Sequence, residues 1–207
     1  LSGEWERLEG HGLKYRLYGE RRMRRSKDGG YPLLVYLHGK NGDVMTSEQP
    51  SQARVFSSED NYDDRPCFII APQNPDQMGW KGSSAEGVVN IVKQLVENLP
   101  IDPTRIYLTG YSMGAYGTFH ILASEPKLFA AGVPVVGVCA SGILIRAVAP
   151  LLADKLSEPP VVSVSDDGAV VVPLLGGHRG ANKIAAQISD ELGAVAAVTT
   201  AGDVALG

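Results

Sequence analysis

Short apolar segments alternate with longer amphipathic segments along most of this chain. The clearest amphipathic segment is 84–98, where Val88, Ile91, Val92 and Leu95 recur at helical spacing. The strand-like apolar runs occupy residues 32–37, 67–71, 105–109 and 133–138. Strands that are apolar on both faces need crossover helices to cover them. The pattern therefore predicts an α/β protein of three layers with a mainly parallel sheet.

The two ends of the chain differ in pattern from this central part. Residues 4–10 and 13–18 mix polar and apolar positions and predict an antiparallel ribbon that leads into the sheet. No Phe, Trp or Tyr follows Phe129, and the rest of the chain is rich in Ala, Val, Gly and Leu. In this later part we expect helices at 142–152 and 180–192, and two strands, 161–164 and 170–174, that flank the turn residues 166–169.

One serine stands between two glycines directly after the apolar run 106–108. The spacing is Gly110, Ser112, Gly114, and residues 115–123 can continue as a helix. A serine that ends a strand and opens a helix passes through a tight turn, which only small neighbours two positions away allow. An ordinary strand-to-helix turn has the same spacing and is the alternative interpretation. The strand before it and the helix after it favour Ser112 as an acyl-transfer nucleophile.

Acyl transfer also needs oxyanion donors, a base and a carboxylate that orients the base. The glycine-bearing loop that begins at His38 follows a predicted central strand, so a backbone N–H near Lys40, together with that of Met113, would form the oxyanion hole. We interpret His38 as shaping this loop. His11, in the lead-in ribbon, and His120, expected to point into the packing, are also disfavoured as bases because the order Ser, Asp, His places the base late in the chain.

Composition and charge argue against some classes of binding partner but do not identify the cellular compartment. A net charge of −4 with 20% charged residues gives no reason to expect nucleic acid, and the basic run 21–27 is expected to be a solvated hairpin loop. No apolar stretch is long enough for a membrane span, so we expect a soluble protein with no membrane partner. The chain begins at Leu1, as a processed product or an excised fragment would, which leaves cytoplasmic and secreted locations open. Cys67 and Cys139 are expected to be buried thiols.

Residues from about 13 to 136 resemble a bacterial α/β-hydrolase esterase of the kind related to polyhydroxybutyrate depolymerases, feruloyl and acetyl esterases and the prolyl oligopeptidase family. The segments that match are 32–39, 66–73, 102–118 and 126–131. The resemblance implies a serine hydrolase with Ser112 as nucleophile and a small-molecule carboxylic ester as substrate. We expect no cofactor and no metal. The oligomeric state is left open.

The esterase pattern is not completed in the last third of the chain. In such esterases an apolar-His-Gly-x-x-Asp segment and a later Gly-His segment follow the elbow, and neither occurs here. From residue 137 the chain resembles the cobalamin-biosynthesis family of cobalt-precorrin-5A hydrolase, through residues 137–155, 160–162, 173–182 and 198–203. The simplest account is a chimera, natural or engineered, joined near 133–138. Residues 1–136 are then esterase-like, and 137–207 either complete one shared sheet or form an appended piece.

Two interpretations of the later polar residues stay open. Asp166, Asp167 and His178 follow Ser112 in the right order for a substituted triad, although a hairpin strand separates the acids from the histidine. Alternatively, His178 and Arg179 open a helix, where exposed N–H groups attract the carboxylates that corrin precursors carry. We expect a carboxylic-ester hydrolase that is impaired. The competing hypotheses are a non-catalytic or engineered chimera and a corrinoid-biosynthesis protein.

Overall fold

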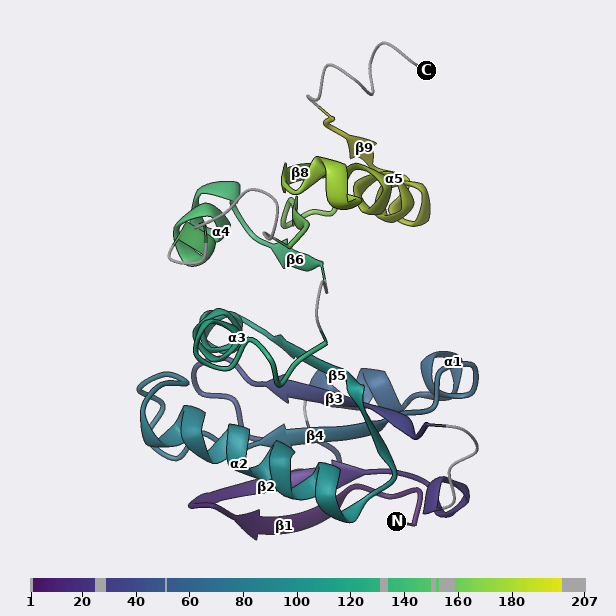
Figure 1. The fold of residues 1–207 in the computed structure, drawn as a ribbon, viewed down its shortest axis with the longest axis vertical. Coiled ribbons are helices and arrows are strands. Elements are labelled where there is room, and N and C mark those ends of the chain that lie inside the picture. The colour runs from purple at the N-terminus through teal and green to yellow at the C-terminus, as the bar shows by residue number, and fades with distance from the viewer. Residues whose placement is uncertain are drawn as a thin grey trace. The chain divides into compact units, whose positions relative to one another are not determined.

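The computed structural model describes residues 2–24, 29–50, 52–130, 134–149, 152 and 159–198. The chain forms two compact units, Leu1–Ala131 and Gly132–Gly207 (Figure 1). Each unit has its own sheet and its own hydrophobic core. The division falls two residues after the last aromatic residue, Phe129, where the composition of the chain changes.

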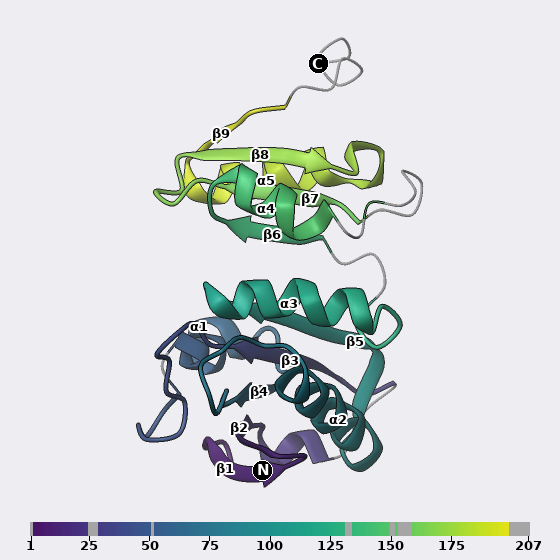
Figure 2. The same ribbon diagram turned by 90° about the vertical axis from the view of Figure 1, so that its left-hand side faces the viewer.

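The first unit is built on a five-stranded sheet in the order β1-β2-β4-β3-β5. Its strands are β1 (Glu6–Gly10), β2 (Leu13–Tyr18), β3 (Tyr31–Leu37), β4 (Phe68–Pro72) and β5 (Ile101–Gly110). Its helices are α1 (Glu59–Tyr62), α2 (Ser83–Asn98) and α3 (Met113–Ser124), with 3-10 turns at Arg21–Arg24 and Gln52–Ser57. Figures 1 and 2 place α2 and α1 on opposite faces of this sheet. The three-layer α/β fold predicted for this part of the chain is confirmed.

Strand direction decides where the functional loops lie. β1 and β2 form the antiparallel ribbon, and β2 also pairs antiparallel with β4. β4, β3 and β5 are parallel to one another. Because the carboxyl ends of parallel strands meet at one edge of a sheet, the loops that follow β3, β4 and β5 lie side by side.

The core of the first unit explains why these strands are central. All five residues of β4 are buried, as expected for a strand covered on both faces. On α2, the apolar stripe predicted from the sequence is buried, from Val88 through Val92 to Leu95. The helix packs against β2 and β5, so the amphipathic pattern specified its inner face correctly.

The second unit has a four-stranded sheet in the order β6-β7-β8-β9. Its elements are β6 (Val135–Val138), α4 (Ser141–Val148), β7 (Val161–Val164), β8 (Val170–Leu175), a 3-10 turn at Gly177–Arg179, α5 (Ala181–Leu192) and β9 (Val195–Ala196). β6 is parallel to β7, β7 is antiparallel to β8, and β8 is parallel to β9.

Helices α4 and α5 cover opposite faces of this second sheet (Figures 1 and 2). Val162 and Val164 pack with Ala181 and Ala185 of α5. Between these two valines, Ser163 faces the other way, and its hydroxyl accepts a hydrogen bond from Ser141 of α4 at 3.2 Å. The alternation of side chains along β7 thus separates the two helices, as the period of a strand requires.

Several expectations about the later part of the chain need correction. β6 pairs with β7 in the second sheet, so the nine strands form two sheets among the described residues and not one shared sheet. Val136 and Val138 are 45% and 66% exposed, which contradicts a strand buried on both faces. The helix expected at 142–152 is observed at Ser141–Val148. Residue 133 of the expected strand lies outside the described residues, as do residues 25–27 of the basic run.

Candidate nucleophile elbow

Ser112 lies in the turn between β5 and α3. Its backbone has φ 52° and ψ −112°, in the positive-φ region that residues other than glycine rarely adopt. The side chain is exposed, and Ser112 is the N-cap position of α3. Strained backbone of this kind persists only when the surrounding structure holds it in place, and it concentrates at functional sites.

The two glycines of the motif are required by close backbone approach. A Cβ on Gly114 would lie 1.9 Å from the carbonyl oxygen of Leu37, at the end of β3. A Cβ on Gly110 would lie 2.4 Å from the backbone of Gly114. Both glycines therefore allow α3 to start directly against the strand ends, and the spacing read from the sequence has a steric cause.

The loop that follows β3 contacts the elbow directly; residues 38–44 are called the 38–44 loop from here on. A Cβ on Gly39 would lie 3.3 Å from Ser112 Cβ and 2.9 Å from Tyr111 Cδ1. The N–H of Tyr111 donates to the carbonyl of Leu37 at 3.1 Å. A turn from Gly39 to Gly42, closed by a hydrogen bond of 3.0 Å, brings the loop around beside Ser112. The expected proximity of the loop and the elbow is therefore observed.

His38 is buried beneath this loop and is fully engaged in holding it. Its Nδ1 lies 2.7 Å from the carbonyl oxygen of Gly39, and the backbone N–H of Asn74 donates to its Nε2 at 2.9 Å. These contacts fix a neutral ring with the proton on Nδ1. Burial lowers the pKa of His38, an effect that the hydrogen bond to Gly39 partly opposes. The interpretation of His38 as a residue that shapes the loop agrees with this geometry.

A second loop, after β4, supports the first one; residues 73–80 are called the 73–80 segment. The side chain of Gln73 accepts from the N–H of Val44 at 2.9 Å and donates to the carbonyl of Gly42 at 3.1 Å. Gln77 accepts from the N–H of Asn41 at 2.8 Å. Trp80 donates from its indole to the carbonyl of His38 at 3.0 Å. The 38–44 loop is therefore held by side chains from the neighbouring strand end.

Trp80 also fixes the position of helix α3. A Cβ on Gly117 would lie 2.2 Å from Trp80 Cβ, so the indole packs directly onto the helix backbone at this glycine. Trp80 is buried, and its ring meets that of His38 edge to face at 5.2 Å between centroids. One side chain thus touches both the helix that begins at the elbow and the loop beside it.

Two backbone N–H groups, those of Lys40 and Met113, are the expected oxyanion donors. Within the part of the chain that the structure describes, neither the N–H of Lys40 nor that of Met113 has a hydrogen-bond partner. Met113 is the first residue of α3, where the helix leaves its initial N–H groups free. The assignment of Lys40 and Met113 as oxyanion donors stays a prediction.

No base accompanies the nucleophile in the described part of the first unit. Among these residues, no side chain hydrogen bonds to Ser112 Oγ. Both ring nitrogens of His38 already have hydrogen-bond partners. His11, in the turn between β1 and β2, hydrogen bonds to Gln94 of α2. His120 lies eight residues further along α3, about 12 Å along the helix axis. It is exposed, so the expectation that it points into the packing was wrong.

The proposed acids of a substituted triad do not lie beside their histidine. Asp166 and Asp167 lie in the turn before β8, whereas His178 lies in the turn after that strand. Six residues of extended chain span about 20 Å. Asp167 instead accepts hydrogen bonds from Ser165 and the N–H of Ala169, which lower its pKa. The pairing of Asp166 or Asp167 with His178 in one triad is therefore wrong.

His178 and Arg179 are exposed on a short 3-10 turn that leads into α5. Gly176 and Gly180 flank this turn with φ of 70° and 103°, which glycine adopts without steric cost. The strand-to-helix placement expected from the sequence is observed. The roles of His178 as a base and of His178 and Arg179 as ligand-binding residues stay predictions.

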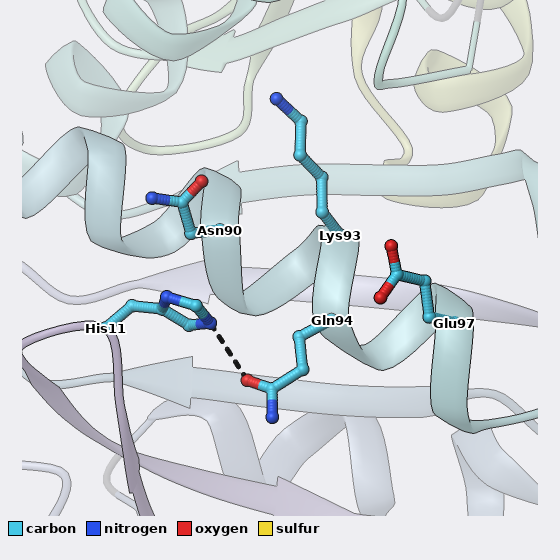
Figure 3. A pocket seen from close by; sticks show the side chains of 5 residues that line it. All are labelled: His11, Asn90, Lys93, Gln94 and Glu97. Carbon is cyan, nitrogen blue, oxygen red and sulfur yellow. Dashed lines mark hydrogen bonds between the residues drawn. The ribbon is translucent and has the colours of Figure 1, made fainter.

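A shallow polar pocket lies on the outer surface of α2, away from the elbow (Figure 3). His11, Asn90, Lys93, Gln94 and Glu97 line it. Its helix residues approach the start of β5, whereas Ser112 follows the end of that strand. The pocket therefore plays no part in the elbow. Among the described residues there is no cluster of three metal-ligating side chains and no helix able to cross a membrane.

The chain has an α/β fold similar to that of a solved esterase. A crystal structure of a thermostable esterase is similar to this chain, with a TM-score of 0.59 and 24% sequence identity, over 95% of this chain and 54% of that one. Residues 77–141, which contain the elbow, match the model of the prolyl oligopeptidase family. Poly(3-hydroxyalkanoate) depolymerase C of Paucimonas lemoignei is 39% identical over 114 residues, which are 51% of this chain and 28% of that protein.

A second family matches the other end of the chain. Residues 125–203 match the family model described as cobalamin synthesis G N-terminal. Cobalt-precorrin-5A hydrolase of Salmonella typhimurium is 46% identical over 66 residues, which are 31% of this chain and 19% of that protein. Both resemblances seen in the sequence are thus confirmed. The two family models overlap at residues 125–141, and the chain spans less than a third of the length of either relative.

Sequence reasoning missed the residues that support the elbow. Gln73, Gln77 and Trp80 act across strands through contacts that no local spacing encodes. The available signal was their place in the segment that follows the buried strand β4, at the sheet edge that also carries the elbow.

Proposed function

We propose that the first unit is the nucleophile half of a serine esterase that acts on small-molecule carboxylic esters. Ser112 would attack the ester carbonyl, and the N–H groups of Lys40 and Met113 would stabilise the oxyanion. The observation that carries the proposal is the positive-φ backbone of Ser112 between two glycines that cannot bear a Cβ. The similarity to esterases and to a depolymerase supports this choice of substrate class.

The activity is proposed to be impaired. The first unit supplies a nucleophile and oxyanion donors, but its described histidines are not placed to accept the proton of Ser112. Enzymes of this type that lose a triad member retain roughly 10³- to 10⁴-fold catalysis over water, from the oxyanion hole and from binding. Without a base to take its proton the Ser112 hydroxyl is a weak nucleophile, so we expect ester hydrolysis through Ser112 to be slow.

Covalent labelling tests the nucleophile directly. A fluorophosphonate should lose fluoride and form one adduct, located by peptide mass spectrometry on Ser112, at a low rate. Ser112→Ala should abolish the adduct. Ser124→Ala, which changes an exposed serine at the other end of α3, should not. A wild-type protein that remains unlabelled, or a label that persists in Ser112→Ala, would refute the proposal.

For the second unit we propose a corrinoid-related origin, and we assign the turn at His178 and Arg179 as an anion-binding surface for acidic corrinoids. The family match over residues 125–203 favours this candidate. Titration with a polycarboxylated cobalt corrinoid should show binding that weakens in a His178→Ala, Arg179→Ala double variant. Equal binding by both proteins, or none by the wild type, would refute this assignment.

A further inference from the structure

Gln73 occupies a junction between three strand ends of the first sheet. It follows β4, which lies between β2 and β3. Its backbone N–H donates to the carbonyl of Lys14 on β2 at 2.8 Å, so its main chain is anchored on the sheet. From this fixed point its side chain reaches the loop that follows β3. The anchor and the reach together make Gln73 a rigid support for that loop.

The amide of Gln73 bridges two backbone groups of the 38–44 loop. Its oxygen accepts from the N–H of Val44 at 2.9 Å, and its nitrogen donates to the carbonyl of Gly42 at 3.1 Å. A side-chain amide is suited to this because it carries a donor and an acceptor in one plane. Glutamate would offer an oxygen to the carbonyl of Gly42, and asparagine is one methylene shorter. The bridge is therefore specific to glutamine.

The same amide also connects the loop to His38. The nitrogen of Gln73 lies 3.2 Å from His38 Nε2, the ring nitrogen that accepts from Asn74. On its other side the ring contacts the carbonyl of Gly39. Both ends of the turn from Gly39 to Gly42 are thus held, one by His38 and one by Gln73, and Lys40 lies between them.

We propose that Gln73 is a positioning residue that sets the direction of the Lys40 N–H, an inference that rests on the proposed esterase function. Oxyanion donors act only within about 2.7–3.1 Å of the developing charge. A misplacement of about 1 Å can lower the rate about 100-fold. Gln73 touches no substrate and acts through the loop that it holds.

The experiment compares Gln73→Met with Gln94→Met. Methionine has nearly the length of glutamine and lacks its hydrogen bonds, and Gln94 is an exposed glutamine on α2 that serves as the matched control. Phenylboronic acid, which forms a tetrahedral adduct with an active serine, is the probe. We expect binding about tenfold weaker or more in Gln73→Met and unchanged in Gln94→Met. Ser112→Ala should abolish it.

A second readout separates this inference from the proposed function. Amide hydrogen exchange should be faster at Val44 and Asn41 in Gln73→Met, while the midpoint of global unfolding changes no more than in Gln94→Met. Ser112-dependent boronate binding that is unaltered in Gln73→Met would overturn the inference and leave the esterase proposal standing.

If the wild type shows no Ser112-dependent boronate binding, the esterase proposal fails, and exchange alone decides whether Gln73 holds the loop. Unaltered exchange in Gln73→Met would then overturn the positioning role as well. If Gln73→Met does not fold, Gln73→Glu, which keeps the acceptor for Val44 and loses the donor to Gly42, serves as the test with the same expected and contradicting outcomes.

Discussion

The steric requirement at Gly114 gives a sharp test of the elbow. In Gly114→Ala the new Cβ would lie 1.9 Å from the carbonyl oxygen and 2.6 Å from the carbonyl carbon of Leu37. Both atoms belong to the backbone of β3, a strand paired on both sides, so neither can move cheaply. Alanine is otherwise favoured over glycine in a helix by about 1 kcal/mol. The clash should outweigh that gain, because overpacking of a tight core typically costs about 1–3 kcal/mol.

The chain offers a matched control for this substitution. Gly142 is the second residue of α4, as Gly114 is of α3, and a Cβ there would meet only the flexible end of Arg146 at 3.3 Å. We expect Gly114→Ala to lower the free energy of unfolding of the first unit by about 2–3 kcal/mol. Gly142→Ala should leave its own unit unchanged or more stable by up to about 1 kcal/mol.

Urea unfolding followed by two signals separates the two units. Both tryptophans, Trp5 and Trp80, lie in the first unit, and no aromatic residue follows Phe129. Tryptophan fluorescence therefore reports on the first unit alone, whereas circular dichroism reports on both. Gly114→Ala should shift the fluorescence transition and slow fluorophosphonate labelling of Ser112. A fluorescence midpoint equal to that of the wild type would refute the close approach of α3 and β3.

Three further predictions concern pH, thiol reactivity and unit independence. Burial lowers the pKa of His38, so the stability that neutral His38 contributes is present above its unfolded pKa of about 6.5 and is lost as the pH falls below that value. The free energy of unfolding, followed by fluorescence, should therefore fall from pH 7 to pH 5. This fall should be less steep in His38→Asn than in the exposed control His120→Gln. Partial burial raises the pKa of Cys67 to about 11, so iodoacetamide at pH 8 should modify this thiol much more slowly in the native than in the unfolded protein. Rapid modification of native Cys67, located by peptide mapping, would contradict this. With two separate cores, denaturant should give two transitions, and a single coincident transition by both signals would show that the units unfold together.

Local sequence patterns predicted individual helices, strands and turns better than they predicted which of these contact one another. The spacing of Gly110, Ser112 and Gly114 encodes the elbow because its steric cause lies within a few residues. The supporting contacts of Gln73 and Trp80 join residues that are distant in sequence, and no periodicity signals them. Asp166 and His178 follow Ser112 in the chain order of a triad, but the whole of β8 separates them. Chain order says nothing about which end of a strand a residue occupies.

The exposure of β6 shows that an apolar sequence does not by itself predict burial. Val135, Val136 and Val138 suggested burial on both faces because they are apolar, but β6 is an edge strand of its sheet, and Val136 and Val138 are exposed. Apolar composition reports the preference of a side chain and not the presence of a neighbour to cover it.

The central claim, a serine nucleophile without a matched base, is tested most directly by hydrolysis of p-nitrophenyl acetate. Values of kcat/KM for the wild type, Ser112→Ala and His178→Ala should be measured side by side at pH 7 to 8. We expect Ser112→Ala to fall below the wild type, to the residual rate that the oxyanion hole and binding support, and His178→Ala to stay close to the wild type. Equal and complete losses in both variants would contradict the account and indicate a working triad, and full activity in Ser112→Ala would exclude the serine mechanism.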